Sequence, residues 1–395
     1  MEPSKLDKDF DYAMQFTRVL LLPLGLWPAN CRVYQRFVRP AAIAICLFVM
    51  LFVIIPMCLF IAFVTKDLKI RLKLFGPLGF SLMSLFKYVM VIYHKGKVAE
   101  CIRSMWLNWR SVRDVTERKI MMDNVRTGRL LIVACGFFMY GGGMPYVAVL
   151  PLTSRPTLRG NLTLRPLAYP SYFVIFDPQV RPIYDFVFGL HCVCGLVRYT
   201  VTCGIYSIAI LSVMHICSQI TITHNMLNKL VENFDYRLLG DIVSRHRHLL
   251  KLASRLEEIF NVICLFEVIG STCIICFLGY YLITEYENRE MMALITYFLL
   301  FLSFVFNIFI LCYIGEILTE QCQSIGIAAY MTDWHRLPQR EAKNIVLLII
   351  RTQRPVYLTA GKLSKLSILS FSTIIKASAS YLHILRTVII PNLTM

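Results

Sequence analysis

The stretch AAIAICLFVMLFVIIPMCLFIAFV, residues 41–64, decides the fold class of this chain. A membrane-spanning helix needs about 20 mostly apolar residues, because a helix rises about 1.5 Å per residue through roughly 30 Å of hydrocarbon. The stretch is long enough and contains no Asp, Glu, Lys or Arg. It therefore predicts a helix that spans a membrane.

Six other stretches have similar length and apolar character. Two of them, residues 130–152 and 291–315, are also uncharged. The remaining four, which contain one or two charged residues each, are residues 74–93, 186–217, 259–283 and 366–390. The sequence thus predicts an all-α membrane protein with seven transmembrane helices.

The overall composition supports a membrane protein and excludes several other classes. Of the 395 residues, 57% are hydrophobic and 16% are charged, and the mean hydropathy is +0.61. A soluble domain with this composition would lack the polar residues to cover its surface. The net charge of +17 comes from basic residues scattered between the apolar stretches, which argues against a nucleic-acid partner. Catalytic and nucleotide-binding motifs are not found, so neither an enzyme nor a cofactor is expected.

The distribution of Lys and Arg predicts the direction of the chain. If residues 1–40 lie inside the cell and the spans alternate, the inside segments hold 28 Lys and Arg residues and the outside segments hold nine. Cytoplasmic loops retain positive charge, so the N-terminus is expected in the cytoplasm and the C-terminus outside. The sequon at Asn161 falls in an outside loop, where glycosylation is possible.

Four segments follow from this topology. Residues 1–40 form a cytoplasmic N-terminal segment, and residues 41–315 form the first six spans. Residues 316–365 form a cytoplasmic region of anchor helices, and residues 366–395 form the last helix and an extracellular C-terminus. Helical periodicity predicts that residues 236–258 continue the fifth span into the cytoplasm, and that residues 341–353 form a separate short helix whose apolar face needs a partner.

The last span is unusually rich in hydroxyl groups. Six Ser and Thr residues lie between positions 366 and 382, whereas residues 291–315 contain only Thr296 and Ser303. Polar groups at membrane depth face other helices or a water-filled path. Helical spacing places the following residues on one side, polar toward the cytoplasm and apolar toward the outside: Ser370, Thr373, Ala377, Ser380, Ile384 and Val388. This pattern predicts a pore-lining helix with an outer hydrophobic constriction. Hydroxyl groups that bond back to their own helix are the alternative.

Charged residues inside the spans need partners. Arg198 and Glu267 fall at similar depths, so the sequence suggests an ion pair between them. Lys87 lies near the inner end of its span, where its ammonium group is expected to reach the membrane surface. Lys376 would repel cations if it faced a pore made only of this chain. His246 and His248 are two residues apart, so one helix face cannot present both to a metal, and no metal site is expected.

A cavity for a small ligand is expected in the outer half of the bundle. The run Gly141-Gly142-Gly143 in the third span lets helices approach closely or leaves room for a ligand. The candidate lining residues are Phe80, Met83, Phe138, Gly142, Tyr146, Cys192, Leu196, Tyr199, Tyr281 and Tyr297. Such a cavity suits a volatile or lipophilic molecule, although ordinary helix packing explains each residue about as well.

Several motifs resemble those of insect odorant receptors. LLLPLGLWP at residues 20–28 is similar to the segment that enters their first span, and HLLKLASRLEEIF at residues 248–260 is similar to their second cytoplasmic loop. The C-terminal region is the most specific part of the resemblance, and it contains Gly315-Glu316, AAYMTDWHRLP at residues 328–338, RTQRPVYLTAG at residues 351–361 and SYLHILR at residues 380–386.

This resemblance implies a ligand-gated, non-selective cation channel in the plasma membrane of olfactory sensory neurons. The family's odorant-specific subunits form heterotetramers with a shared co-receptor, whose second cytoplasmic loop is longer than residues 218–258 here. The chain therefore resembles an odorant-specific subunit that takes a small volatile odorant. Pore and gate roles are implied for Ser380, Tyr381, Ile384 and Val388.

Three other classes of membrane protein share some of these features. A G-protein-coupled receptor also has seven spans, but it needs an extracellular N-terminus and an Asp-Arg-Tyr motif after the third span. A gustatory receptor has a related fold, and the segment around Thr359-Ala360-Gly361 favours the odorant branch. A transporter is disfavoured because no inverted repeats are visible.

Overall fold

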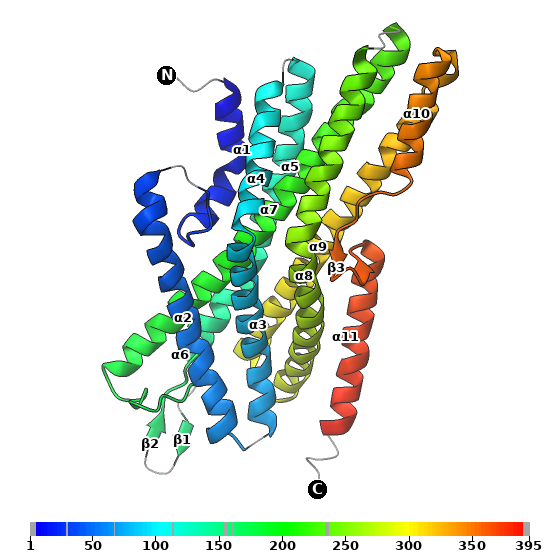
Figure 1. Cartoon of the computed structure of the whole chain (residues 1–395). Helices are drawn as coiled ribbons and strands as arrows, with labels where there is room; N and C mark the ends of the chain where they lie inside the picture. The colour runs from blue at the N-terminus through cyan, green and yellow to red at the C-terminus, as the bar shows by residue number, and fades with distance from the viewer. Residues whose placement is uncertain are drawn as a thin grey trace.

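The seven spanning helices predicted from the sequence are present. In a computed structural model of the chain, the structure describes residues 5–28, 31–66, 68–112, 114–153, 157–159, 162–233 and 237–389. Seven helices in these ranges are long and apolar enough to cross a membrane. The fold is an elongated helical bundle, and its two ends carry the N-terminus and the C-terminus respectively (Figure 1).

The spanning helices have the following bounds. The first comprises the π-helix η1 (Tyr34–Val38), α2 (Arg39–Leu59) and a second π-helix, η2 (Phe60–Val64). The third comprises α5 (Val115–Met144), the π-helix η3 (Pro145–Val149) and α6 (Leu150–Thr153). The others are α3 (Leu68–Tyr93), α7 (Ile183–Asn233), α8 (Arg237–Glu287), α9 (Met291–Met331) and α11 (Ile368–Ile389).

Shorter elements lie at the two ends of the bundle. Near the N-terminal end lie α1 (Lys5–Leu21), α4 (Lys95–Ser111) and α10 (Gln339–Thr352), which follows the 3-10 turn η4 (Trp334–Arg336) (Figure 1). At the opposite end, β1 (Thr157–Arg159) pairs antiparallel with β2 (Leu162–Leu164). A second hairpin pairs β3 (Thr359–Ala360) with β4 (Ser364–Lys365). The helix predicted at residues 341–353 is confirmed as α10, whereas α1 and α4 were not predicted.

Three helices run far beyond the membrane thickness. α8 is 51 residues long and includes residues 237–258, which confirms that the fifth span continues as a helix. α7 and α9 extend in the same way past residues 217 and 315, where the predicted spans end. Their extensions reach the end of the bundle that carries α4 and α10 (Figure 1). There they form the scaffold on which the shorter helices pack.

The helices differ greatly in how much of their surface is covered. In the most apolar window of α7, 94% of the residues are buried, whereas the corresponding window of α11 has only 11% buried. α7 is therefore the central helix of the bundle. α11 packs on α8 and α9 at the periphery and leaves most of its surface to lipid or to another subunit.

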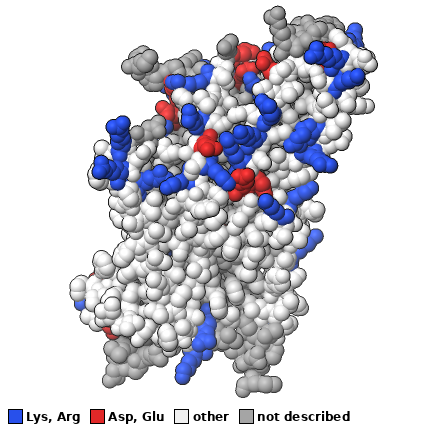
Figure 2. Space-filling view, in the orientation of Figure 1, with Lys and Arg blue, Asp and Glu red and all other residues white. Residues whose placement is uncertain are grey.

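Charged side chains gather at one end of the molecule. On the face shown in Figure 2, most Lys, Arg, Asp and Glu side chains cover the end that carries the N-terminus, and a nearly uncharged band follows below it. This band covers the parts of the helices that the sequence assigns to the membrane. The arrangement agrees with an N-terminus on the positively charged, cytoplasmic side.

The β3–β4 hairpin connects the helices that meet where α11 begins. The backbone nitrogen of Thr359 donates to the Glu257 carboxylate on α8 at 2.9 Å, and the Thr359 hydroxyl donates to the same carboxylate. Gly361 has a φ of +62°, and its nitrogen donates to the Asn261 carbonyl oxygen at 2.8 Å. The backbone nitrogen of Ile368 donates to Glu316 of α9 at 3.0 Å. The hairpin therefore fixes the start of α11 against α8 and α9.

Candidate ligand-binding site

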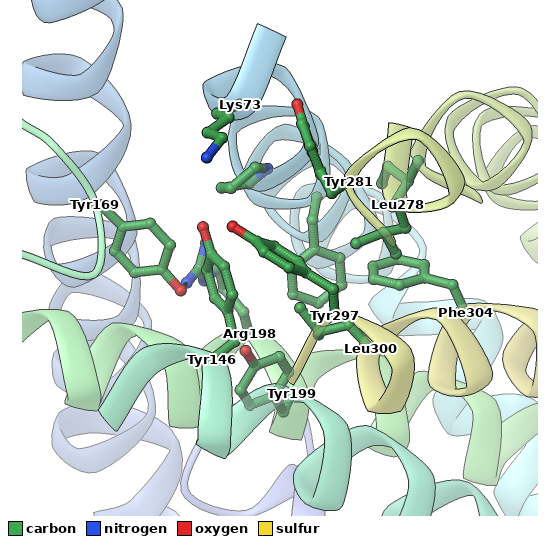
Figure 3. A pocket seen from close by; sticks show the side chains of 14 residues that line it. Lys73, Tyr146, Tyr169, Arg198, Tyr199, Leu278, Tyr281, Tyr297, Leu300 and Phe304 are labelled. Atoms are coloured by element: carbon green, nitrogen blue, oxygen red, sulfur yellow. Dashed lines mark hydrogen bonds between the residues drawn. The ribbon is translucent and has the colours of Figure 1, made fainter. Parts of the chain in front are cut away.

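A small cavity lies within the bundle among α3, η3, α7, α8 and α9 (Figure 3). Its volume is about 40 Å³. The lining residues are Lys73, Gly76, Pro77, Phe80, Tyr146, Tyr169, Arg198, Tyr199, Ile274, Leu278, Tyr281, Tyr297, Leu300 and Phe304. A cavity of this volume holds one or a few water molecules, so a larger ligand requires side chains to move.

Aromatic rings make up most of the cavity wall. The Phe80 ring centroid lies 5.7 Å from that of Tyr199 and 5.3 Å from that of Phe304, which it meets edge to face. On the other side, the Tyr297 centroid lies 5.4 Å from that of Tyr281 and 6.2 Å from that of Tyr146. Rings at these separations and angles attract each other while presenting apolar faces to the cavity.

Arg198 supplies a positive charge at the edge of this aromatic wall. The side chain is fully buried, and its guanidinium group donates hydrogen bonds to the hydroxyl oxygens of Ser81 and Tyr169 and to the Cys194 carbonyl oxygen. The guanidinium carbon also lies 4.6 Å from the centroid of the Tyr169 ring. These contacts compensate the buried charge through hydrogen bonds and a cation–π interaction. Tyr169 belongs to the loop before α7, so Arg198 joins this loop to α3 and α7.

The suggested ion pair between Arg198 and Glu267 is wrong. Glu267 pairs instead with Lys87, whose nitrogen lies 2.9 Å from the carboxylate, and both side chains are almost completely buried. Lys87 therefore does not extend to the membrane surface. Its position near the inner end of a span had suggested that it would. The depths of Arg198 and Glu267 were estimated from the rise per residue, but helix rotation turns Arg198 toward Ser81 and Tyr169.

The glycine run in α5 brings its backbone close to two other helices. The Tyr199 hydroxyl donates to the Gly143 carbonyl oxygen at 3.0 Å, and a Cβ atom at Gly143 would lie 2.2 Å from the Tyr199 ring. A Cβ atom at Gly142 would lie 2.0 Å from the Ser303 hydroxyl oxygen of α9. Gly141 faces open space. Two of the three glycines are therefore needed for close packing, and Gly143 sets the position of a cavity-lining ring.

The cavity brings together half of the residues suggested by the sequence. Phe80, Tyr146, Tyr199, Tyr281 and Tyr297 line it.

The other five suggested residues lie elsewhere. Met83 contacts Gly270 of α8, Phe138 stacks on Phe306 of α9 at 4.1 Å, and Gly142 packs against Ser303. Leu196 is exposed on α7, and Cys192 is partly buried outside the cavity lining.

Two polar cavity residues were missed by the sequence reasoning. Tyr169 lies in a loop, where no helical period predicts the direction of a side chain. Lys73 lies near the start of α3 and forms an ion pair with Glu285 of α8 at 3.0 Å. The charged pair is visible in the sequence only as two isolated charges at the outer ends of two spans.

On α11, the residues suggested for the pore and gate face away from the rest of the chain. Thr373, Ser380, Tyr381 and Ile384 are exposed, whereas Ile374 and Ser378 are buried against the bundle. The hydroxyl groups of Thr373 and Ser380 donate to carbonyl oxygens one helical turn earlier. These two residues therefore follow the alternative in which hydroxyl groups bond back to their own helix. The side chain of Val388 and the whole of Asn161 lie outside the described residues.

Within the described ranges, no group of three or more His, Cys, Asp or Glu side chains is placed to hold a metal ion. The polar groups of the cavity are phenol hydroxyls, the guanidinium group of Arg198 and the ammonium group of Lys73.

Structural comparison places the fold among insect olfactory receptors. The structure of the olfactory receptor OR5 from Machilis hrabei in complex with eugenol superimposes with a TM-score of 0.79 and 16% sequence identity, covering 97% of this chain and 98% of that one. A second structure of the same receptor also gives a TM-score of 0.79, at 15% identity. At this level of identity the likeness concerns the fold.

Sequence comparison extends the likeness to named receptors. Odorant receptor 13a of Drosophila melanogaster is 26% identical over 258 residues, which cover 56% of this chain and 62% of that protein. Odorant receptor 67a of the same species is 28% identical over 207 residues, which cover 48% of this chain and 49% of that protein. The matched parts thus span between about half and two thirds of these relatives.

The family model described as 7tm Odorant receptor matches residues 71–379, which is most of the chain. The matched region begins in α3 and reaches into α11, so it contains the whole cavity and most of the C-terminal motifs. The chain therefore belongs to the odorant receptor family of seven-helix membrane proteins.

Proposed function

We propose that this protein is the odorant-specific subunit of a ligand-gated, non-selective cation channel. A small volatile molecule binds in the cavity around Tyr199, and its binding opens a pore lined by α11. The observation that carries the proposal is the uncovered side of α11, where hydroxyl groups are followed by Tyr381 and Ile384. A helix with polar groups exposed at membrane depth needs a water-filled path or another subunit beside it.

The cavity chemistry supports a small and largely apolar ligand. Aromatic and aliphatic side chains provide most of the contact surface, and the hydroxyl groups of Tyr146, Tyr281 and Tyr297 can orient one polar group of the ligand. The Tyr281 hydroxyl is buried and has no hydrogen-bond partner within the described residues. A ligand oxygen that accepts a hydrogen bond from this group would remove its desolvation cost. The OR5 structure in complex with eugenol provides a precedent for a ligand of this kind.

Assembly with the family's shared co-receptor is part of the proposal. α10 leaves Leu347 and Ile350 exposed, at 62% and 55%, although it lies at the charged end of the bundle. Apolar side chains exposed outside the membrane mark a surface that contacts another protein. The exposed Lys376 on α11 disfavours a cation pore made of four identical chains and suits a heterotetramer.

Localisation and direction in the membrane also belong to the proposal. We propose the plasma membrane of olfactory sensory neurons, with residues 1–40 and 316–365 in the cytoplasm and the C-terminus outside. An epitope placed before Met1 should be stained only after cells are permeabilised. An Asn161→Gln variant should lose any mobility shift produced by a glycosidase, because Asn161 would lie outside the cell.

The central experiment is co-expression with the co-receptor in cells that lack other odorant receptors. A panel of volatile molecules should include at least one that evokes a cation current, and the current should persist when G-protein nucleotide exchange is blocked. The co-receptor alone is the control. A response that requires G-protein exchange would refute the channel proposal.

A further inference from the structure

A second hollow lies on the outside of the bundle, along the seam where α3 and α8 pack together. It has a volume of about 600 Å³ and is lined by residues between positions 75 and 89 of α3 and between positions 266 and 277 of α8. Every lining residue is apolar, a glycine or a cysteine. Below, this hollow is called the α3–α8 groove. It lies within the spanning part of both helices, so its opening faces the hydrocarbon of the membrane.

Aromatic pairs mark the two ends of the α3–α8 groove. The rings of Phe75 and Phe277 are stacked with centroids 6.2 Å apart, and those of Phe86 and Phe266 are 4.1 Å apart. Between them, Met83 lies against Gly270 of α8, where an added Cβ atom would displace the Met83 side chain. The two helices therefore pack closely where Met83 meets Gly270.

The α3–α8 groove and the ligand cavity share one lining side chain. Ile274 lines both of them. Opposite Ile274, α3 presents Gly79, where the nearest atom to an added Cβ would be Cγ1 of Ile274 at 4.0 Å. Gly76, which lines the cavity, has nothing within 4 Å of such an atom. Ile274 and Gly79 therefore face each other where the two hollows meet, and rotation of the Ile274 side chain would widen the gap between them.

The backbone of α3 is also easy to deform at this point. Pro77 lies inside the helix between the two glycines and lacks the N–H group that would bond to the preceding turn. Helices bend at such positions because the hydrogen-bond ladder is interrupted. A bend of α3 at Pro77 would move Lys73 and Gly76, which line the cavity, relative to the part of the helix that packs on α8 at Met83.

By contrast, polar contacts cross the other boundary of the cavity. Lys73 and Glu285 form an ion pair at 3.0 Å between the outer ends of α3 and α8. Tyr169 of the loop before α7 is held by Arg198 at the cavity wall (Figure 3). A ligand that enters beside these contacts meets charged and polar groups, whereas a ligand in the α3–α8 groove meets only apolar side chains, glycines and a cysteine.

From these contacts we propose that the α3–α8 groove is the entrance through which an apolar ligand dissolved in the membrane reaches the cavity, by passing between Gly79 and Ile274. The inference rests on the proposed role of the cavity in ligand binding. A lipophilic molecule concentrates in hydrocarbon, so a lateral entrance presents it to the site at a higher local concentration than water does. The entrance controls how fast the ligand arrives and leaves, and the cavity controls how tightly it binds.

The test narrows the entrance without changing the cavity. Gly79→Leu adds a side chain opposite Ile274, whose Cγ1 would lie 4.0 Å from the new Cβ atom. Gly136→Leu on α5 is the matched control, because an added Cβ atom there meets nothing within 4 Å. Currents are recorded from the co-expressed channel during rapid application and removal of an activating odorant. For Gly79→Leu, we expect onset and decay to slow by about fivefold, which corresponds to about 1 kcal/mol of added barrier. The concentration for half-maximal response should stay the same, because a barrier acts equally in both directions.

The native Cys273 provides a second measurement that does not depend on the folding of a variant. Cys273 is exposed in the α3–α8 groove. Labelling with N-phenylmaleimide should slow the onset and decay of the odorant-evoked current in the wild-type protein. It should leave the current of Cys273→Ser unaffected, and this variant also controls for labelling at other exposed cysteines.

Three outcomes would overturn the proposal. The first is unchanged kinetics in wild-type protein labelled at Cys273. The second is a shift of the half-maximal concentration with unchanged rates in Gly79→Leu, which would make the α3–α8 groove a binding site for lipid or ligand. The third is the absence of any odorant-evoked current from the wild-type pair, which would refute the proposed function and the entrance with it.

Discussion

The side-chain nitrogen of Lys87 on α3 lies 2.9 Å from a carboxylate oxygen of Glu267 on α8, and neither side chain is more than 3% exposed. Lys87 also donates a hydrogen bond of 3.1 Å to the Thr202 hydroxyl on α7. The same nitrogen lies 6.0 Å from the ring of Phe80, which lines the cavity. One buried charge pair therefore joins the three helices that carry one wall of the proposed ligand site.

We expect the loss of either partner to be severe. Lys87→Met or Glu267→Gln leaves an uncompensated polar or charged group in the bundle, and breaking a buried pair costs about 3–5 kcal/mol. Surface expression of each single variant should therefore fall strongly. The exchange Lys87→Glu with Glu267→Lys should restore part of it, because the pair is re-formed in the reverse direction. Surface biotinylation of the co-expressed channel measures both effects.

The control for this exchange is the combination Arg198→Glu with Glu267→Arg. In the structure Arg198 contacts Ser81 and Tyr169, so this combination breaks two sets of contacts and should rescue nothing. Recovery with the Arg198 combination, together with none in the Lys87 exchange, would show that the pairing described here is wrong.

These contacts show what the sequence can and cannot determine about intramembrane charges. Depth follows from the position in a span, because each residue advances the helix by about 1.5 Å. Arg198 and Glu267 were placed at similar depths for that reason. Depth alone does not say which way a side chain points, and that direction depends on how α3, α7 and α8 rotate against one another. The partner of Glu267 is consequently Lys87.

A second prediction uses the glycine run of α5. A methyl group at Gly143 would lie 2.2 Å from the Tyr199 ring, so Gly143→Ala should displace that ring within the cavity. We expect the concentration for half-maximal odorant response to rise by about tenfold, the effect of about 1.4 kcal/mol of lost binding free energy. Concentration–response curves of the co-expressed channel provide the measurement.

Gly141→Ala is the matched control. It makes the same change two residues earlier in α5, where a Cβ atom meets nothing within 4 Å. Its response should equal that of the wild type. Equal responses from Gly143→Ala and Gly141→Ala, at equal surface expression, would show that the position of the Tyr199 ring does not affect ligand binding.

The cavity itself could be predicted only in part. Phe80, Tyr146, Tyr199, Tyr281 and Tyr297 line it, and all five are aromatic residues in the outer halves of their spans. Large rings so placed tend to be found in the lining because they fill the space between helices. Smaller or more flexible candidates carried no directional information, which is why Leu196 faces outward on α7.

Loop residues and short amphipathic helices escaped prediction for a different reason. Tyr169 reaches the cavity from an irregular segment, and its direction depends on the hydrogen bond from Arg198. α1 and α4 are mixed in polarity and too short to span, and each is fixed by charged contacts between distant parts of the chain. For example, Arg118 at the start of α5 forms a bidentate pair with Asp9 of α1. Such long-range pairs are not encoded in local periodicity.

A third prediction concerns the β3–β4 hairpin. Gly361 has a φ of +62°, and a Cβ atom there would lie 2.7 Å from the Leu265 side chain on α8. Gly361→Ala should destabilise the protein by about 1–2 kcal/mol from the left-handed backbone alone, and further through the contact with Leu265. The melting temperature of the detergent-solubilised channel should fall. Gly240→Ala, where nothing lies within 4 Å, should leave it unchanged or slightly higher. Equal melting temperatures for the two variants would mean that the hairpin does not depend on the glycine.

The last prediction tests the proposed gate on α11. Ile384 is 55% exposed, on an uncovered side of α11 near the C-terminal end of that helix. If this side lines the pore, Ile384 contributes to a hydrophobic constriction that excludes water when the channel is closed. Ile384→Ser should therefore wet the constriction and produce a steady cation current without odorant, visible as a holding current that a pore blocker removes.

The comparison residue is Leu369, which is 77% exposed at the opposite end of α11. Leu369→Ser introduces the same kind of polar group on the same helix but outside the proposed constriction, so its basal current should match that of the wild type. A leak in both variants would indicate a general loosening of α11. A leak in neither, at normal surface expression and with normal odorant responses, would show that Ile384 faces lipid or a neighbouring subunit, and the hydroxyl groups of α11 would then serve only to bond to their own helix.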